Sequence, residues 1–151
     1  MPSIDDFVQR FEEAWRDPVN KFVELFAPEG TLLQSGMDKP LTRDEIPAHQ
    51  VRTSTLLPDM SVQVVRSAIN DSDVFIEWES SGTFLGRRVN WGGASRFTLV
   101  DGLIVEEIAY FDTLPLRALV DPRISGGDMA SAAVAAAERD QNAGTFVDTN
   151  S

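Results

Sequence analysis

Residues 60 to 111 carry the feature that most constrains the fold, a region in which apolar and polar residues alternate. Alternation with a period of two is typical of strands that bury one face. Turn-forming residues interrupt the region, and the last interruption, Asp101-Gly102, is a strong hairpin signal. The strands predicted in this way are 60–69, 74–84, 89–100 and 103–111. Three successive hairpins predict an antiparallel meander.

Helices are predicted before these strands. Ser3-x-x-Asp6 resembles a capping box, and apolar residues follow at spacings of three and four, which predicts a helix with one aromatic-rich face. Asp17-Pro18 is typical of a helix start, and we expect a second helix that contains Phe22–Phe26 and ends at 28–30. Helices followed by a meander predict an α+β fold.

Shorter elements are predicted around these. Residues 31–34 form an extended segment, and Thr42-x-x-Glu45 opens a third helix that continues to about Thr55. Pro47 lies either in the first turn of that helix or at a bend. Residues 114–120 form a short helix after the last strand.

The composition changes after residue 120, so we expect one domain over 1–120 and an extension over 121–151. Residues 128–139 contain six alanines and are expected to be helical by propensity. Residues 141–151 are expected to be disordered unless Phe146 anchors them. Deletion of 122–151 should leave the domain folded.

The charge balance excludes several classes of partner. The chain has 13 Lys and Arg against 24 Asp and Glu, a formal net charge of -11. Such a chain repels phosphate backbones and anionic lipid, so neither nucleic acid nor a membrane is expected as a partner. The chain has no cysteine and one histidine, and we therefore expect no metal site. The acidic N-terminus and the lack of a long apolar run predict a cytoplasmic protein.

The segment Asp101–Asp112, with its Tyr-Phe-Asp ending and the apolar helix that follows, resembles the last strand of SnoaL-like polyketide cyclases and limonene epoxide hydrolases. Together with the order of the elements, it makes residues 3–120 similar to the NTF2-like superfamily. The resemblance implies a curved antiparallel sheet, a cone-shaped half-barrel, with N-terminal helices closing a central apolar pocket. It also implies chemistry by carboxylates without a cofactor, and a homodimer packed through the outer sheet face.

The catalytic positions that the resemblance implies hold other residues in this chain. The Arg-x-Asp pair of the epoxide hydrolases corresponds to Trp78 and Ser80, and their second Asp corresponds to Ala109. Their water-holding Tyr and Asn fall on Leu33 and Ser35. The positions that correspond to the Tyr and the two Asp residues of ketosteroid isomerases are Phe11, Gln34 and Ser95. Neither chemistry can be transferred directly.

Glu107 is the main catalytic candidate. If Ala109 faces the cavity, as the resemblance implies, the period of two places Glu107 on the same face together with Val105 and Phe111. A buried carboxylate there would act as a general base. The alternatives are a partly solvated Glu107 near the mouth of the cavity and a register in which Glu106 points inward. Three further candidates are His49 and Tyr110, which would assist Glu107, and Asp112, which either reacts or caps the following helix.

An aromatic wall for a flat or apolar ligand is the second expectation. The residues expected to contact the ligand are Phe11, Trp15, Leu33, Trp78, Ser80, Trp91, Ser95, Ala109 and Phe111. A filled core is the alternative. Gly92-Gly93 indicates a bulge, room for a ligand or sheet curvature. Arg96 is predicted on the outer face, paired with Glu77, Glu79 or Glu106.

Three hypotheses about function follow. The chain is an isomerase, hydratase or cyclase that acts on an apolar cyclic molecule, or it binds such a molecule without reaction, or it is an interaction module with a filled interior. The partners expected are a small-molecule ligand and a second copy of the chain.

Overall fold

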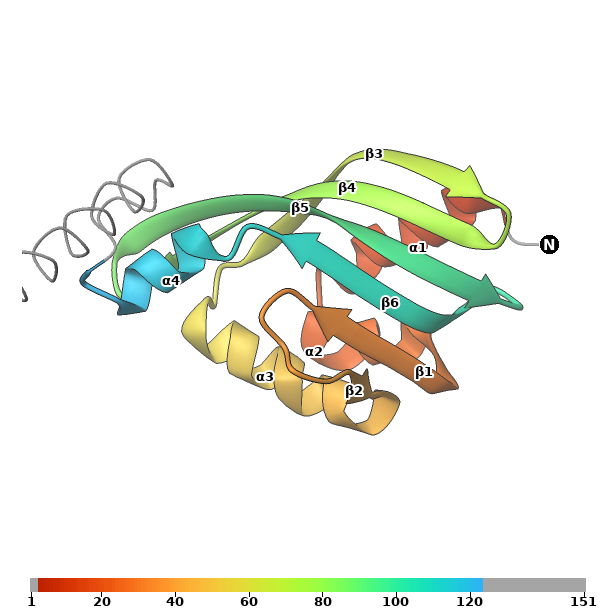
Figure 1. The fold of residues 1–151 in the computed structure, drawn as a ribbon, viewed down its shortest axis with the longest axis horizontal. Coiled ribbons are helices and arrows are strands. Elements are labelled where there is room, and N and C mark those ends of the chain that lie inside the picture. Colours follow the sequence, from red (N-terminus) through yellow and green to blue (C-terminus); the bar gives the residue numbers. More distant parts are fainter. Residues whose placement is uncertain (1–2, 124–151) are drawn as a thin grey trace, which may run out of the picture. The chain divides into compact units, whose positions relative to one another are not determined.

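The computed structural model describes residues 3–123 (Figure 1). The chain divides into two compact units, and the division follows Asp112. The first unit contains the sheet and three helices. The second begins with the helix α4 (Leu114–Val120), which has the predicted bounds. The alanine-rich segment and the tail that the sequence singled out lie outside the described residues.

The helices of the first unit begin where the sequence signals place them. Helix α1 (Ile4–Ala14) starts at a capping box in which Ser3 and Asp6 exchange hydrogen bonds. A second capping box joins Thr42 and Glu45 at the 3₁₀ turn η2 (Arg43–Glu45), which leads into α3 (Ile46–Leu56). Pro47 lies in the first turn of α3, where it leaves no hydrogen bond of the helix unmade.

The second predicted helix is shorter than expected. Helix α2 (Pro18–Lys21) continues into a 3₁₀ turn η1 (Phe22–Leu25), and the chain is already a strand from Phe26 onward. The predicted end at residues 28–30 was therefore wrong. Phe26 is buried at the start of this strand, so its burial comes from the sheet and not from a helix face.

Six strands form one open sheet in the order β2-β1-β6-β5-β4-β3. The four long strands are the predicted meander, β3 (Ser61–Asn70), β4 (Asp73–Phe84), β5 (Arg87–Val100) and β6 (Leu103–Phe111). Strand β1 (Phe26–Gln34) joins β6 in parallel, and β2 (Leu41–Thr42) adds a short antiparallel edge. The predicted α+β architecture is confirmed, with a sheet that is mixed because of β1.

The sheet has one buried and one exposed face, which we call the inner and outer faces. On β4, the inner side chains include Ile76, Trp78 and Ser80, while Glu77 and Glu79 are exposed. Helix α1 covers the inner face, because the rings of Phe7 and Phe11 lie 5.0 and 5.5 Å from that of Phe97 on β5. The aromatic face predicted for the first helix therefore packs on the sheet.

Strand β6 departs from strict alternation at Val105. Thr98 on β5 is the partner of Glu106, while the next residue, Leu99, is the partner of Ile104. The extra residue on β6 is a β-bulge, and it turns Ile104 into the core. The prediction that Val105 shares the inner face with Glu107 was therefore wrong, because the bulge shifts the alternation by one residue.

Candidate functional site

Glu107 lies on the inner face of β6, and its side chain is only 4% exposed. It is the partner of Phe97 on β5 and of Leu32 on β1, so strands with buried apolar side chains flank it. Burial raises the pKa of Glu107 to about 8, and a hydrogen bond from Ser95 lowers it in part. Glu106, the alternative that the sequence left open, faces outward and binds Arg96.

One oxygen of this carboxyl has no partner. Oε2 of Glu107 is buried and finds no hydrogen-bond partner among residues 3–123. A buried polar atom without a partner is costly and is uncommon in folded proteins. An unpartnered carboxyl oxygen on an apolar inner face is typical of a group kept for a ligand or a reaction.

Ser95 on β5 and Trp78 on β4 lie on the same inner face as Glu107. Trp78 Nε1 donates to Ser95 Oγ over 3.1 Å, and both residues are buried. Ser95 lies beside Glu107 on the neighbouring strand β5, where its hydroxyl lowers the pKa of Glu107 in part. The sequence placed Trp78 and Ser95 on the inner face, but it did not indicate that they form a hydrogen bond with each other.

Two further buried polar atoms lack partners, Oε1 of Gln50 and Nε1 of Trp15. Trp15 follows α1, and its ring packs 5.0 Å from that of Phe22. Gln50 was missed by the sequence reasoning. It lies one helical turn after the buried Ile46 on α3, and a polar residue at that spacing is the signal that could have found it.

The residues predicted to contact a ligand lie on or beside the inner face, except Leu33. Leu33 is the partner of Ile108 and points to the outer face, so its predicted contact was wrong. Those that are buried are Phe11, Trp78, Ser80, Trp91, Ser95 and Ala109. Those that are partly buried are Trp15, Leu33 and Phe111. Two of the serines have structural partners, since Ser80 Oγ donates to Ser61 O over 2.8 Å and Ser35 Oγ accepts from Phe111 N over 3.1 Å.

The space beside Gly93 is filled. A Cβ on Gly93 would lie 2.8 Å from Cζ2 of Trp78 and 2.7 Å from Cβ of Phe111, and it would also collide with the carbonyl oxygen of Tyr110. The register between β4 and β5 is regular through Gly92 and Gly93. The predicted bulge at this pair was therefore wrong, and the space for a ligand is absent at Gly93 but present at Gly92, where a Cβ would meet nothing closer than Trp78 O at 3.5 Å. Gly93 leaves room for the Trp78 ring.

Tyr110 does not join Glu107. It lies on the outer face opposite Ala94, and its side chain is 59% exposed. Adjacent residues of a strand point to opposite faces, so Tyr110 cannot share the face of Ala109. Its predicted role beside Glu107 was wrong for this reason.

His49 and Asp112 stay candidates. His49 is partly buried on α3, and desolvation, with a smaller contribution from Arg52, lowers its pKa, which favours the neutral imidazole. Asp112 follows β6 at the end of the first unit and is exposed. The N-cap of α4 is Thr113, whose side chain makes no capping hydrogen bond.

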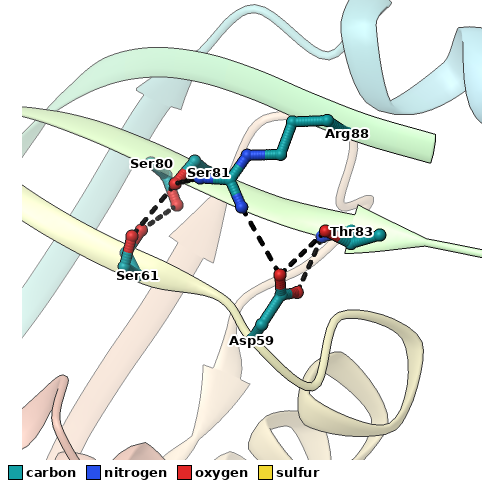
Figure 2. Close-up of polar contacts among 6 residues, drawn as sticks. All are labelled: Asp59, Ser61, Ser80, Ser81, Thr83 and Arg88. Atoms are coloured by element: carbon teal, nitrogen blue, oxygen red, sulfur yellow. Dashed lines mark hydrogen bonds and ion pairs between the residues drawn. The ribbon is translucent and has the colours of Figure 1, made fainter. Parts of the chain in front are cut away.

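A polar hollow of about 560 Å³ opens over β3, β4 and β5. Its lining consists of Ser61, Gln63, Glu79, Ser80, Ser81, Arg88, Asn90, Trp91 and Gly92. Figure 2 shows the contacts at its edge, where Asp59 accepts from the backbone and hydroxyl of Thr83 over 2.7 and 2.8 Å. Arg88 binds both Asp59 and Ser81. These contacts join the segment before β3 to the β4–β5 hairpin.

Within residues 3–123, no three acidic or histidine side chains are grouped so that they could hold a metal ion. None of the helices in that range is long and apolar enough to cross a membrane. Among the described residues, the inner face instead offers one buried acid, Glu107, together with Ser95, Trp78 and further aromatic rings.

Comparison with known proteins identifies the class. The model of the SnoaL-like domain family matches residues 6–107, and the chain belongs to this family. No curated protein sequence matches the chain. The matched segment covers α1 through the strand that carries Glu107.

Solved structures have the same fold. A protein of Catenulispora acidiphila with a ketosteroid isomerase-like fold, in complex with trimethylamine, is 20% identical, with a TM-score of 0.69 over 75% of this chain and 90% of its own. The phenazine biosynthesis-related protein PhzB2 of Pseudomonas aeruginosa is 21% identical, with a TM-score of 0.64 over 77% and 80%. A limonene epoxide hydrolase-like (LEH-like) epoxide hydrolase of M. tuberculosis is 18% identical, with a TM-score of 0.61 over 76% and 90%. Such identities establish the fold alone.

Proposed function

We propose that the chain binds a small apolar, cyclic molecule between the inner face of the sheet and the helices, and that Glu107 exchanges a proton with it. The observation that carries the proposal is the buried Oε2 of Glu107, which has no partner in the part of the chain that the structure describes. A ligand atom that donates to or accepts from Oε2 would satisfy it. The aromatic rings of Trp78 and Trp91 on neighbouring strands favour an apolar ligand.

The chemistry follows from the protonation state of Glu107. A carboxyl with a pKa of about 8 is mostly protonated at neutral pH, so it can act as a general acid there. The ionised minority is a stronger base than an ordinary carboxylate, because basicity rises with pKa. In an isomerisation the proton taken from one atom of the substrate returns to another. Such a reaction balances without a cofactor, and a hydration would need only water as co-reactant.

The solved relatives support a small-molecule ligand. The Catenulispora protein was crystallised with trimethylamine, and the M. tuberculosis protein is described as an epoxide hydrolase. The residues that would perform epoxide hydrolysis are replaced by Trp78, Ser80 and Ala109 in this chain. The proposed reaction is therefore of the isomerase, hydratase or cyclase type.

Binding without reaction is the second candidate. The same three replacements favour it, because they remove the acids and the arginine that the resemblance implies. Under this proposal Glu107 would hydrogen-bond a ligand that leaves unchanged. An interaction module with a filled interior is a third candidate, and it requires that no small molecule binds at the inner face.

Native mass spectrometry of the protein purified from its own host separates these candidates. A small molecule that co-purifies provides the substrate for a turnover assay with the wild type, Glu107→Gln and the control Glu106→Gln. Loss of turnover in Glu107→Gln alone supports the proposed chemistry, whereas equal turnover in all three proteins overturns it. A ligand bound but never converted supports binding alone, and repeated purification without any ligand favours the interaction module.

The outer face favours a homodimer. Phe75 on β4 and Tyr110 on β6 are large, and they are 40% and 59% exposed on the same face of the sheet. Exposed aromatic residues on a sheet face are typical of an interface. We therefore propose that two copies pack through this face. The expected cytoplasmic location stays a prediction.

A further inference from the structure

We infer that Gln50 and Trp15 select a hydroxylated ligand at the inner face of the sheet. The inference deepens the proposed function, because it requires that a small cyclic molecule binds there. It adds a functional group that this molecule must carry, and the requirement holds whether or not Glu107 reacts.

Gln50 and Trp15 hold buried polar atoms of opposite hydrogen-bonding character. Oε1 of Gln50 is an acceptor, whereas Nε1 of Trp15 is a donor and never an acceptor. Neither atom finds a partner among residues 3–123, and Gln50 as a whole is only 2% exposed. A buried polar atom without a partner destabilises the folded state, so each of the two needs an explanation.

A series of aromatic contacts joins Trp15 to the acid on the inner face. The ring centroid of Trp15 lies 6.3 Å from that of Phe11, and the Phe11 ring lies 5.5 Å from that of Phe97. Phe97 is the cross-strand partner of Glu107, and the Cβ atoms of such partners are about 4.5–5.5 Å apart. The unpaired donor of Trp15 therefore belongs to the aromatic cluster that borders Glu107.

Gln50 lies on the buried side of α3. Ile46, Gln50 and Leu57 are spaced by four and seven residues, which places them on one helical face, and all three are buried. Helix α3 packs against η1, and the ring of Phe22 in η1 lies 5.0 Å from that of Trp15. The unpaired acceptor and the unpaired donor thus lie on two segments that share η1 as a neighbour.

A hydroxylated ligand has both functions that these atoms lack. A hydroxyl oxygen accepts from an indole N–H, and a hydroxyl hydrogen is donated to an amide oxygen. A ligand without hydroxyl groups would leave both atoms unpaired. Sites that hydrogen-bond a substrate group discriminate strongly against analogues that lack it, whereas a purely apolar pocket discriminates weakly. The two residues therefore determine specificity, while the aromatic rings supply affinity for any flat apolar molecule.

Thermal unfolding of the ligand-free protein is the first test. Methionine is similar in length to glutamine and has no oxygen, so Gln50→Met removes the unpaired acceptor and leaves the packing volume nearly unchanged. We expect its melting temperature to rise by roughly 2–4 °C, because a group kept for a ligand lowers stability. Gln63→Met, at an exposed position on β3, is the matched control and should stay near the wild type. An unchanged or lower melting temperature in Gln50→Met overturns the inference.

Binding of three flat probes is the second test. The probe 2-naphthol carries a hydroxyl group, 2-methoxynaphthalene carries an acceptor without a donor, and naphthalene carries neither. NMR titration of ¹⁵N-labelled protein at pH 7 gives the dissociation constants, and Trp15→Phe identifies the indole resonance of Trp15.

We expect the wild type to bind 2-naphthol about tenfold more tightly than naphthalene, with 2-methoxynaphthalene in between, because hydrogen bonds to the two buried atoms are gained. Binding of 2-naphthol should also shift the Trp15 indole resonance. Gln50→Met should lose most of the preference for 2-naphthol over 2-methoxynaphthalene, and Gln63→Met should retain it.

The inference and the proposed function fail in different ways. If the three probes bind equally well, or if the preference persists in Gln50→Met, the inference is overturned and the apolar site stands. A preference that disappears in Glu107→Gln instead would mean that the acid recognises the hydroxyl group, which also overturns the inference. If Gln50→Met loses the preference but Glu107→Gln converts the natural substrate as the wild type does, the inference stands and the proposed chemistry falls. If no probe binds, both fall.

Discussion

Arg96 and Glu106 face each other across β5 and β6 on the outer face of the sheet, with Nη2 and Oε1 2.6 Å apart. The hydroxyl of Thr98 accepts a hydrogen bond from Nη1 of Arg96 and donates one to Oδ1 of Asp73 over 2.6 Å. Because adjacent residues of a strand point to opposite faces, holding Glu106 outside keeps Glu107 inside. The ion pair and the buried acid are thus two consequences of one register.

Glu106→Gln is expected to lower the free energy of unfolding by no more than about 1 kcal/mol, because the Arg96–Glu106 pair is partly exposed and water screens it. The Glu106 side chain is 47% exposed. Urea unfolding at pH 7 measures the effect, with the exposed Glu79→Gln as the control. A loss of several kcal/mol would mean that this pair, and not the buried inner face, determines the register of β6.

Glu107→Gln is expected to stabilise the protein at high pH. The folded pKa of Glu107 lies above the unfolded value of 4.5, so the native state binds more protons than the unfolded state between pH 4.5 and about 8. The contribution of Glu107 to the free energy of unfolding is therefore greatest below pH 4.5, falls as the pH rises to about 8 and is constant above. Glutamine is neutral at every pH and does not suffer this loss.

Thermal unfolding of the two proteins at pH 5 and pH 9 measures the difference. Each kcal/mol corresponds to roughly 2–4 °C for a chain of this size. The melting temperature of Glu107→Gln minus that of the wild type should be several degrees larger at pH 9 than at pH 5. A difference that is the same at both pH values would contradict a raised pKa.

Gly93→Ala is expected to destabilise the protein by ~1–3 kcal/mol, because the added Cβ overlaps Trp78 and Phe111 in a packed region. Gly92→Ala is the matched control, since its Cβ would meet nothing closer than Trp78 O at 3.5 Å. Denaturant unfolding should show a loss in the first variant and a change below about 0.5 kcal/mol in the second. Equal losses would show that glycine is needed at position 93 for the conformation of the strand and not for the fit of the Trp78 ring.

Tyr110→Glu is expected to shift the protein from dimer toward monomer, because it places a charge on the outer face that we propose as the interface. Light scattering at micromolar concentration gives the mass directly. Val100→Glu serves as a control, at an exposed position next to the β5–β6 turn. A wild-type protein that is monomeric at this concentration would remove the dimer proposal.

The long strands were predictable because period-two alternation and turn residues mark both their faces and their ends. Strand β6 has the predicted bounds, and the capping boxes at Ser3 and Thr42 predicted the starts of two helical segments. The helix predicted over Phe22–Phe26 was wrong because a short apolar run is compatible with helix, turn or strand. Only the pairing of β1 with β6, which joins distant parts of the chain, decides its end.

The site was predictable in part. Alternation from Ala109 placed Glu107 inside, but the bulge at Val105 depends on the register with β5, which no local signal marks. The contact of Trp78 with Ser95 likewise depends on how two strands align. Tyr110 was predicted to assist Glu107, although alternation from Ala109 places it on the opposite face.

Titration of Glu107 in the wild-type protein tests the central claim most directly. The claim is that Glu107, a buried carboxyl with an unpartnered oxygen, has a pKa near neutral pH, which suits it to exchange a proton. Carboxyl-detected NMR of the ligand-free protein should give a midpoint of about 8 for Glu107. A midpoint near the ordinary value of 4.5 would show that water reaches the carboxyl, and it would contradict the claim.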